Sequence, residues 1–386
     1  MPRFVVTYRI FASEIEEASE RAAGIALEQT VEIPRDVVPR GYVEDEIVGK
    51  VESVTEEEQG RHLARISYSP DSVSDELPQL LNVIFGNSSI QKGIKVVDLE
   101  LGSTLAERFR GARFGVAGVR RLTRRATGGL ISPVIKPQGS DAATLADIAY
   151  RCALAGADIV KDDHGLTDQH MAPFKNRCEM VCAAVARANR ETGGSCLYMP
   201  NLAGRSADLM EYARFAKDCG AGGVLVMPGL FGFDLVRRLA VDATFGLPIM
   251  THPTFLGSYV LSDTLGFTHA AMFGTLQRLA GADISIFPNV GGRFGFSAAE
   301  CSSIADACRD LTGIGRPILP SLGGGMSAER AGEMKRMYGD DAVFLLGGSL
   351  LRYGDRIGEA IKELRKALYM SFSAEEGLHR PGQPTH

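Results

Sequence analysis

A regular alternation of short apolar runs with amphipathic stretches, beginning at Gly129, is the feature that most limits what this chain can fold into. Such a pattern is typical of βα units whose strands form a parallel sheet. Eight units are enough to close a barrel, whereas an open doubly wound sheet usually has fewer strands. The sequence therefore predicts a (β/α)8 TIM barrel. The eight apolar runs cover residues 130–136, 158–163, 196–200, 223–228, 247–252, 283–287, 317–322 and 342–347.

The residues before the barrel have a different order of elements. They read as strand, helix, strand, strand, helix, strand, which is the split βαβ pattern of a ferredoxin-like α+β domain. The strand-like runs cover residues 3–10, 47–54, 62–69 and 94–101, and the helical runs cover 15–26 and 75–85. Residues 110–127 have no clean period and are interpreted as a linker. We therefore expect an α/β protein with an N-terminal domain over residues 1–120 and a barrel domain over residues 121–386.

The length and charge of the chain agree with this division and exclude several classes of partner. At 386 residues the chain has room for a barrel, which uses about 250 residues, and one smaller domain. A net charge of -5 offers no basic surface for nucleic acid. No run approaches the roughly 18 apolar residues of a membrane span, and residues 1–9 alternate like a strand and unlike a signal peptide. We expect a cytoplasmic protein that binds neither nucleic acid nor membrane.

The ends of the apolar runs carry the candidate site. In a TIM barrel the active site is built at the C-terminal ends of the strands. Here those ends are polar or rich in glycine, and a purely structural barrel has no need to gather such residues on one rim. The candidates are Lys136, Lys161, Asp163, His164, Asn201, His252, Arg293, Ser321, Gly323, Gly324, Gly347 and Gly348.

The glycines after the last two strands are candidates for binding phosphate. Gly323 and Gly324 follow the seventh run, and Gly347 and Gly348 follow the eighth. Backbone N–H groups can converge on an anion where no side chain intrudes, and barrels commonly bind phosphate at these two loops. Tight βα turns would also use glycine. Because both loops carry the glycines together, we interpret them, with Ser321 and Asn201, as the substrate and phosphate site.

Lys161, Asp163 and His164 are candidates for a metal site. Strand alternation points Lys161 and Asp163 to the same face, and His164 could turn inward where the strand ends. A protonated lysine is a poor ligand for a hard cation, but a carbamylated lysine is a carboxylate and could join Asp163 in binding Mg²⁺. A plain ion pair between the lysine and the aspartate remains the alternative.

The residues around Lys161 resemble a known family. The run 155–163, Ala-Gly-Ala-Asp-Ile-Val-Lys-Asp-Asp, closely resembles the carbamate and metal motif of the RuBisCO large-chain family, G-G-x-D-F-x-K-D-D-E. The resemblance continues from about Phe4 to Ala367 and implies the same two-domain fold. Its other matches are the V-G-N motif at Asn87, T-x-K-P-K at Lys136, H-x-H-R at His252, S-G-G at Ser321 to Gly324, the second phosphate glycines at Gly347 and Gly348, and the closing loop at Arg293.

Departures from the family pattern argue against carboxylation. His164 stands where the third metal ligand is glutamate, Gln138 where the motif has its second lysine, and Pro253 where it has arginine. Arg293 replaces the lysine of the closing loop, which holds carbon dioxide in the family, and a guanidinium is geometrically unlike an ammonium. The resemblance therefore implies a form IV RuBisCO-like protein that does not fix carbon dioxide.

The half of the family site that makes an enolate is retained. The resemblance implies that Mg²⁺, held by carbamylated Lys161 with Asp163 and His164, polarises a carbonyl and stabilises an enolate. Lys136 is expected to shuttle the proton, or only to position the substrate. His252 is expected to orient a substrate hydroxyl, or is simply a histidine with satisfied hydrogen bonds at a strand end.

Several reactions are compatible with these retained residues. RuBisCO-like proteins are known to isomerise 5-methylthioribulose 1-phosphate, to enolise a diketo-methylthiopentyl phosphate and to decarboxylate a 3-oxo-isoapionate 4-phosphate. Asn87 lies where the diketone enolases have lysine, so enolisation is the least favoured and isomerisation of a phosphorylated ketose is preferred. A non-catalytic regulatory protein is favoured by His164 and opposed by the presence of Lys136, Lys161 and Asp163 together.

The resemblance also implies a homodimer. In the family, residues equivalent to Asn87, and less securely to Glu28 and Thr30, reach the barrel of the other subunit. The active sites would then be shared between two copies of this chain, and the only other expected partner is the small phosphorylated substrate.

Overall fold

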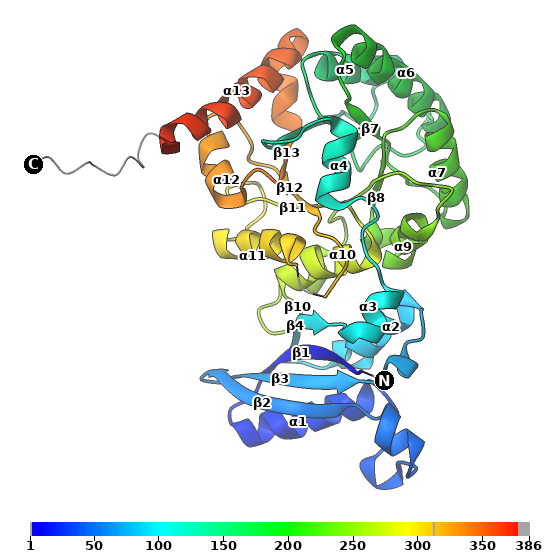
Figure 1. The fold of residues 1–386 in the computed structure, drawn as a ribbon, viewed down its shortest axis with the longest axis vertical. Helices are drawn as coiled ribbons and strands as arrows, with labels where there is room; N and C mark the ends of the chain where they lie inside the picture. Colours follow the sequence, from blue (N-terminus) through cyan, green and yellow to red (C-terminus); the bar gives the residue numbers. More distant parts are fainter. Residues whose placement is uncertain (1, 312, 377–386) are drawn as a thin grey trace, which may run out of the picture.

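The computed structural model describes residues 2–311 and 313–376. It contains two sheets, a five-stranded sheet near the N-terminus and an eight-stranded parallel sheet that curls into a barrel surrounded by helices (Figure 1). The predicted fold class, a TIM barrel with a small N-terminal α+β domain, is confirmed.

The N-terminal sheet has the strand order β10-β4-β1-β3-β2. Strands β1 to β4 pair antiparallel in the order of a split βαβ fold, and the short strand β10 from the barrel region joins β4 in parallel. The strands are β1 (Phe4–Phe11), β2 (Lys50–Glu58), β3 (Arg61–Tyr68), β4 (Ile94–Glu100) and β10 (Gly266–Phe267), and the helices are α1 (Ile15–Glu28), α2 (Leu77–Phe85) and α3 (Gly102–Arg108).

Strand β2 is the element that the sequence placed least well. The predicted run 47–54 ends too early, because the strand continues to Glu58 and residues Val43–Ile47 form a helical turn. This strand lies at the edge of the sheet, and most of its side chains are exposed. An exposed edge strand has no buried face to enforce apolar alternation, so its sequence carries little periodic signal.

The barrel strands follow the order β7-β6-β5-β13-β12-β11-β9-β8. A parallel bridge between Asn201 and Leu225 joins the two outer strands and closes the barrel. A strand forms at each of the eight predicted runs, and β11 and β12 end one residue beyond the predicted bounds. They are β5 (Leu130–Ile135), β6 (Ile159–Asp162), β7 (Leu197–Met199), β8 (Val224–Val226), β9 (Ile249–Thr251), β11 (Ile284–Pro288), β12 (Leu319–Gly323) and β13 (Val343–Leu346).

Helices pack around the barrel with their apolar faces inward. Local sequence signals start two of them, because Asp141 accepts a hydrogen bond from the Thr144 amide and Ser297 forms a capping box with Glu300. The outer helices are α5 (Ala142–Leu154), α6 (Phe174–Thr192), α7 (Leu209–Asp218), α8 (Pro228–Phe231), α9 (Phe233–Val241), α10 (Leu276–Ala280), α11 (Ala298–Arg309), α12 (Ala331–Tyr338) and α13 (Ile357–Glu376).

The segment predicted as a linker contains a helix that closes one end of the barrel. Helix α4 (Gly115–Thr123) crosses the barrel in Figure 1, and its Val119 belongs to the same buried cluster as the inward side chains of the barrel strands. The amides of Phe114 and Gly115 both donate to the carboxylate of Asp283, just before β11. The helix was missed because its apolar stripe is short and is interrupted by glycine and arginine. The domain division near residue 120 stays a prediction, and it falls inside α4.

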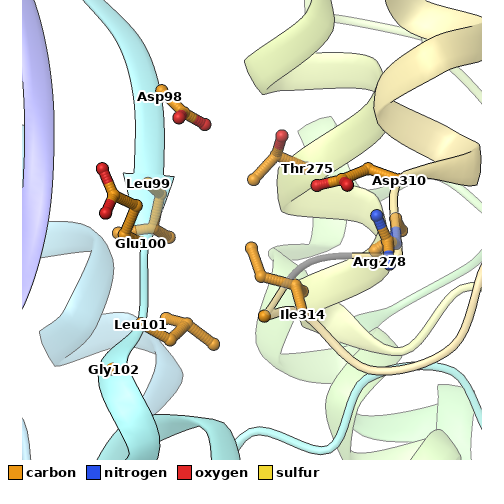
Figure 2. Close-up of a pocket in the computed structure, with 10 residues that line it drawn as sticks. Asp98, Leu99, Glu100, Leu101, Gly102, Thr275, Arg278, Asp310 and Ile314 are labelled. Atoms are coloured by element: carbon orange, nitrogen blue, oxygen red, sulfur yellow. The ribbon is translucent and has the colours of Figure 1, made fainter.

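The two parts of the chain leave a cavity of about 260 Å³ between them. Figure 2 shows it between the end of β4, with Asp98, and the barrel helices, with Thr275 and Asp310. None of the predicted site residues lines this cavity, so it is separate from the candidate site at the ends of the barrel strands. Within residues 2–311 and 313–376, no helix combines the length and the apolar character needed to cross a bilayer.

Candidate active site

Lys161 lies on β6 and points into the barrel mouth. Its side chain is only 1% exposed, and its Nζ donates a hydrogen bond of 2.7 Å to the carbonyl oxygen of Asp162. Burial lowers the pKa of Lys161 to about 8, although the nearby carboxylate of Asp163 partly opposes that shift. A buried lysine with a lowered pKa is more often neutral than a surface lysine, and a neutral amine is the form that can react with carbon dioxide.

Asp163 lies beside two side chains that are cationic or can become cationic. Its Oδ2 lies 3.4 Å from the Nζ of Lys136, at the end of β5, and its Oδ1 lies 3.2 Å from the Nδ1 of His164. Burial would raise the pKa of this carboxyl, but the hydrogen bond from His164 and the charges of Lys136 and Lys161 outweigh burial and lower it well below its usual range. Asp163 is therefore an ionised oxygen donor at any physiological pH.

His164 and His252 meet across the barrel mouth. Their rings stack with centroids 4.1 Å apart, although His252 follows β9, which is not a neighbour of β6 in the sheet. The Thr254 amide donates to Nδ1 of His252, so the neutral ring carries its proton on Nε2. Burial and the nearby Lys161 and His164 lower the pKa of His252 well below its usual value. His252 is thus a neutral group available to orient a substrate hydroxyl.

The candidate metal ligands fit a cation only if Lys161 is modified. Among the residues that the structure describes, no three acidic, histidine or cysteine side chains gather as a ready metal site. Asp163 and His164 are together, and a carbamate on Lys161 would add the missing oxygen ligand. Two anionic oxygen donors and an imidazole suit a divalent cation, although less well than three carboxylates.

The predicted phosphate glycines lie on neighbouring strands. Gly323 ends β12 and pairs with Leu345 of β13, so the loop that holds Gly324 and the loop that holds Gly347 and Gly348 start side by side. Gly324 and Gly348 are exposed, and a Cβ atom at Gly347 or Gly348 would meet nothing within 4 Å. The buried hydroxyl of Ser321 has no hydrogen-bond partner among the described residues. The loops therefore offer open backbone at the glycines, and Ser321 adds a buried hydroxyl that has no partner among the described residues.

Comparison with known proteins identifies the family. The family described as ribulose bisphosphate carboxylase large chain, catalytic domain, matches residues 115–295. The 5-methylthioribulose-1-phosphate isomerase of Rhodospirillum rubrum is 39% identical over 361 residues, which make up 92% of this chain and 94% of the relative. The chain belongs to the RuBisCO large-chain family. The sequence-based prediction of membership is therefore confirmed.

Other relatives are RuBisCO-like proteins. The ribulose bisphosphate carboxylase-like protein 1 of Rhodopseudomonas palustris is 36% identical over 92% of this chain and 95% of the relative. The crystal structure of a Rubisco-like protein from that organism superposes with a TM-score of 0.83, covering 99% of this chain and all of the other. A 2,3-diketo-5-methylthiopentyl-1-phosphate enolase of Bacillus velezensis is 29% identical over 97% of this chain and 95% of the relative. The isomerase and the enolase weighed above are thus both relatives of this RuBisCO-like protein.

Asn201 bonds to the loop that carries His164. It is 0% exposed, and its side-chain amide donates to the carbonyl oxygens of His164 and Leu166 at 2.9 and 3.0 Å. These bonds hold the loop that carries His164, while the side-chain oxygen of Asn201 is buried without a partner in the described part of the chain. Direct contact with substrate stays a prediction, and the structure gives this residue a positioning contact.

The sequence did not single out the network beneath the RuBisCO-like metal motif. Asp162 and Arg177, both 0% exposed, form an ion pair of 3.0 Å between β6 and α6. Asp162 also accepts hydrogen bonds from the Tyr198 hydroxyl at 2.8 Å and from the backbone N–H of Asn201 at 3.0 Å. Strand alternation already placed Asp162 on the face opposite Lys161. Its partner could not be read from the sequence, because Arg177 looks like any polar residue of an amphipathic helix.

Arg293 and Asn87 lie apart from the lysine cluster. Arg293 is exposed in the loop after β11, with its guanidinium 5.6 Å from the ring centroid of Phe294. Asn87 is exposed in the N-terminal part, where its side-chain amide donates to Glu28 at 2.9 Å, and the Thr30 hydroxyl, just after α1, donates to backbone oxygens of that helix. The structure thus gathers Lys136, Lys161, Asp163, His164 and His252 in one place and leaves Arg293 and Asn87 outside that cluster.

Proposed function

We propose that this RuBisCO-like protein isomerises a phosphorylated ketose such as 5-methylthioribulose 1-phosphate. The observation that carries the proposal is the convergence of Lys136, Lys161, Asp163 and His252 beside open phosphate glycines. The relative named as an isomerase is 39% identical, whereas the relatives named as enolases are 28–31% identical, which supports isomerisation over enolisation. The named activities of these relatives also favour an enzyme over a non-catalytic regulatory protein.

In this proposal each residue of the cluster has a separate task. Isomerisation of a ketose begins with removal of a proton next to a carbonyl and ends with its return to a neighbouring carbon. Lys136, 3.4 Å from Asp163, is placed to exchange that proton and is oriented by the carboxylate. The neutral His252 orients a hydroxyl of the substrate. The backbone of Gly323, Gly324, Gly347 and Gly348 holds the phosphate, and Ser321 adds its free hydroxyl.

A divalent cation, Mg²⁺, completes the proposed site. Carbamylated Lys161, Asp163 and His164 would hold it. When bound, the cation would polarise the substrate carbonyl and stabilise negative charge on its oxygen. The ionised state of Asp163 and the deep burial of Lys161 support this assignment. Arg293, on the loop after β11, would cover the bound substrate.

The reaction can be tested directly on the purified protein. Incubation with 5-methylthioribulose 1-phosphate, Mg²⁺ and bicarbonate in heavy water should give an isomeric ketose phosphate and carry deuterium into it, as followed by NMR. Ribulose 1,5-bisphosphate with labelled carbon dioxide should give no labelled acid, because Arg293, Gln138 and Pro253 replace residues of the carboxylase pattern. Restoring Arg293→Lys alone should not create carboxylation. Labelled acid from the native protein would contradict the proposal, as would an inert ketose phosphate.

We propose further that the working unit is a homodimer in the cytoplasm. Exposed large apolar side chains occur on several loops after the barrel strands, and Ile90, three residues after Asn87, is 83% exposed. Exposed apolar groups of this kind are typical of surfaces that a partner covers. The loop side chains are Met171, Phe255, Leu261 and Phe294, and Leu230 of the short helix α8 is also exposed. All seven cysteines are free, as expected for a reducing compartment.

Shared active sites lead to a complementation test. Mixing Asn87→Ala chains with Lys161→Ala chains should recover activity, because one of the two sites in a mixed dimer would draw its intact residues from different subunits. A statistical mixture should approach about one quarter of native activity, since half of the dimers are mixed and each has one good site. Activity should be followed by the deuterium exchange above. If mixed dimers form but remain inactive, Asn87 acts within its own subunit or outside the chemistry.

A further inference from the structure

Two loops of the barrel mouth pack directly against each other. One is the loop after β11, residues 289–297, which carries Arg293, and the other is the loop after β12, which carries the phosphate glycines. A Cβ atom at Gly325 would lie 3.2 Å from both the oxygen of Gly291 and the nitrogen of Gly292. The two backbones are therefore in contact, and the absence of side chains at these glycines is what allows the contact.

Arg330 stabilises this contact by bonding to both loops. Its Nη1 donates to the carbonyl oxygen of Val290 at 3.0 Å and to that of Gly325 at 2.9 Å. One nitrogen thus bonds to both loops at once. The guanidinium fills the space over the glycines, since a Cβ atom at Gly291 or Gly325 would lie within 3 Å of the same Nη1. Glu333 holds the other side of the guanidinium with two contacts of 3.1 and 3.2 Å.

The helix that follows Arg330 strengthens the attachment at the root of the Arg293 loop. Arg330, Met334 and Tyr338 are spaced by four residues and so share one helix face. The Tyr338 hydroxyl donates to the side-chain oxygen of Asn289 at 2.6 Å, and the Asn289 amide lies 3.0 Å from the Met334 sulfur. Met334 and Tyr338 of α12 therefore contact Asn289, and Arg330, which immediately precedes the helix, contacts Val290.

We propose that Arg330 is a positioning residue that couples the phosphate loop to the Arg293 loop. A phosphate bound at Gly323 and Gly324 would restrict the motion of the Gly325 carbonyl. Because Nη1 of Arg330 bonds to the carbonyls of both Gly325 and Val290, it would also restrict the motion of Val290 and of the loop that follows it. Binding of the substrate phosphate thereby holds Arg293 over the barrel mouth. This inference rests on the proposed phosphate site, and Arg330 itself touches neither substrate nor reacting atoms.

Hydrogen exchange of the native dimer, measured by mass spectrometry with and without inorganic phosphate, tests the coupling. In Arg330→Met the peptide over residues 290–296 should exchange about tenfold faster or more, because two charge-assisted hydrogen bonds are lost. Arg330→Lys should restore part of the protection. Arg336→Met, an exposed arginine of the same helix, removes the same charge and should leave exchange unchanged.

Adding phosphate distinguishes the role of Arg330 from the existence of the phosphate site itself. In the native protein, phosphate should slow exchange both at residues 322–326 and at 290–296. In Arg330→Met it should slow exchange only at 322–326. Native-like exchange at 290–296 in Arg330→Met would overturn the coupling. The coupling would also be overturned if phosphate protected both segments of Arg330→Met as much as it protects them in the native protein. Absence of any protection at 322–326 in the native protein would instead overturn the phosphate site, and the coupling with it, without bearing on whether Arg330 tethers the loop.

Discussion

Lys161→Met should abolish Mg²⁺-dependent proton exchange, lowering its rate by about a thousandfold or more, because the variant cannot form the carbamate that we propose as a ligand of the metal. Methionine has nearly the shape of the lysine side chain, so the buried space beside β6 stays filled. The rate is measured by deuterium incorporation into the ketose phosphate. Lys161→Ala and Lys161→Arg should be equally inactive, since neither supplies an anionic oxygen.

The fold of the Lys161 variants should survive the substitution. Lys161 is only 1% exposed, and its Nζ bonds to the Asp162 carbonyl. Losing that bond costs about 1–3 kcal/mol, which is partly offset because a buried ammonium no longer has to be desolvated. Circular dichroism should therefore show a folded protein.

Bicarbonate supplies the control for the carbamate itself. Preincubating the native protein with bicarbonate and Mg²⁺ should raise its activity, whereas the Lys161 variants should not respond. Lys175→Met, an exposed lysine on α6 paired with Glu211, should respond like the native protein. Full activity of Lys161→Met without bicarbonate would rule out the carbamate and leave acid–base catalysis by Lys136.

Arg177→Met should destabilise the protein by about 3–5 kcal/mol, because it leaves the Asp162 carboxylate buried without its charge partner. Both side chains are 0% exposed, and the bonds from Tyr198 and Asn201 do not neutralise the charge. Arg177 also donates to the carbonyl oxygen of Thr167 at 2.7 Å, so the loop after the metal motif should loosen too. The midpoint of urea unfolding is the measurement.

Two further variants separate the buried pair from a general effect of losing an arginine. Arg187→Met, on the same helix but about half exposed, should leave the midpoint unchanged. Adding Asp162→Asn to Arg177→Met should recover part of the lost stability, since no unpaired charge then remains buried. If Arg177→Met unfolds at the native midpoint, the pair contributes nothing and the metal motif is held by other contacts.

Much of the fold and of the site was predictable from local pattern. Each barrel strand lies within a predicted apolar run or extends one residue beyond it, because strands buried in a barrel are largely apolar. The lysines, Asp163 and the two histidines were found because parallel strands end on the same rim, where polar residues from different strands can approach one another. The motif around Lys161 identified the family for the same reason, since its spacing follows from one strand and its loop.

The sequence alone therefore determined the barrel, the rim that carries the site and the family, all of which depend on periodicity and on order along the chain. Only the tertiary structure decided that Arg177 pairs with Asp162 and that α4 covers one end of the barrel. It also decided that His164 stacks on His252 and that Arg330 joins two loops. In each case the partners come from different elements, and the choice of partner depends on how the closed barrel brings those elements together. A single sequence records the chemistry of each side chain, but the distances between such side chains are set only when the chain has packed.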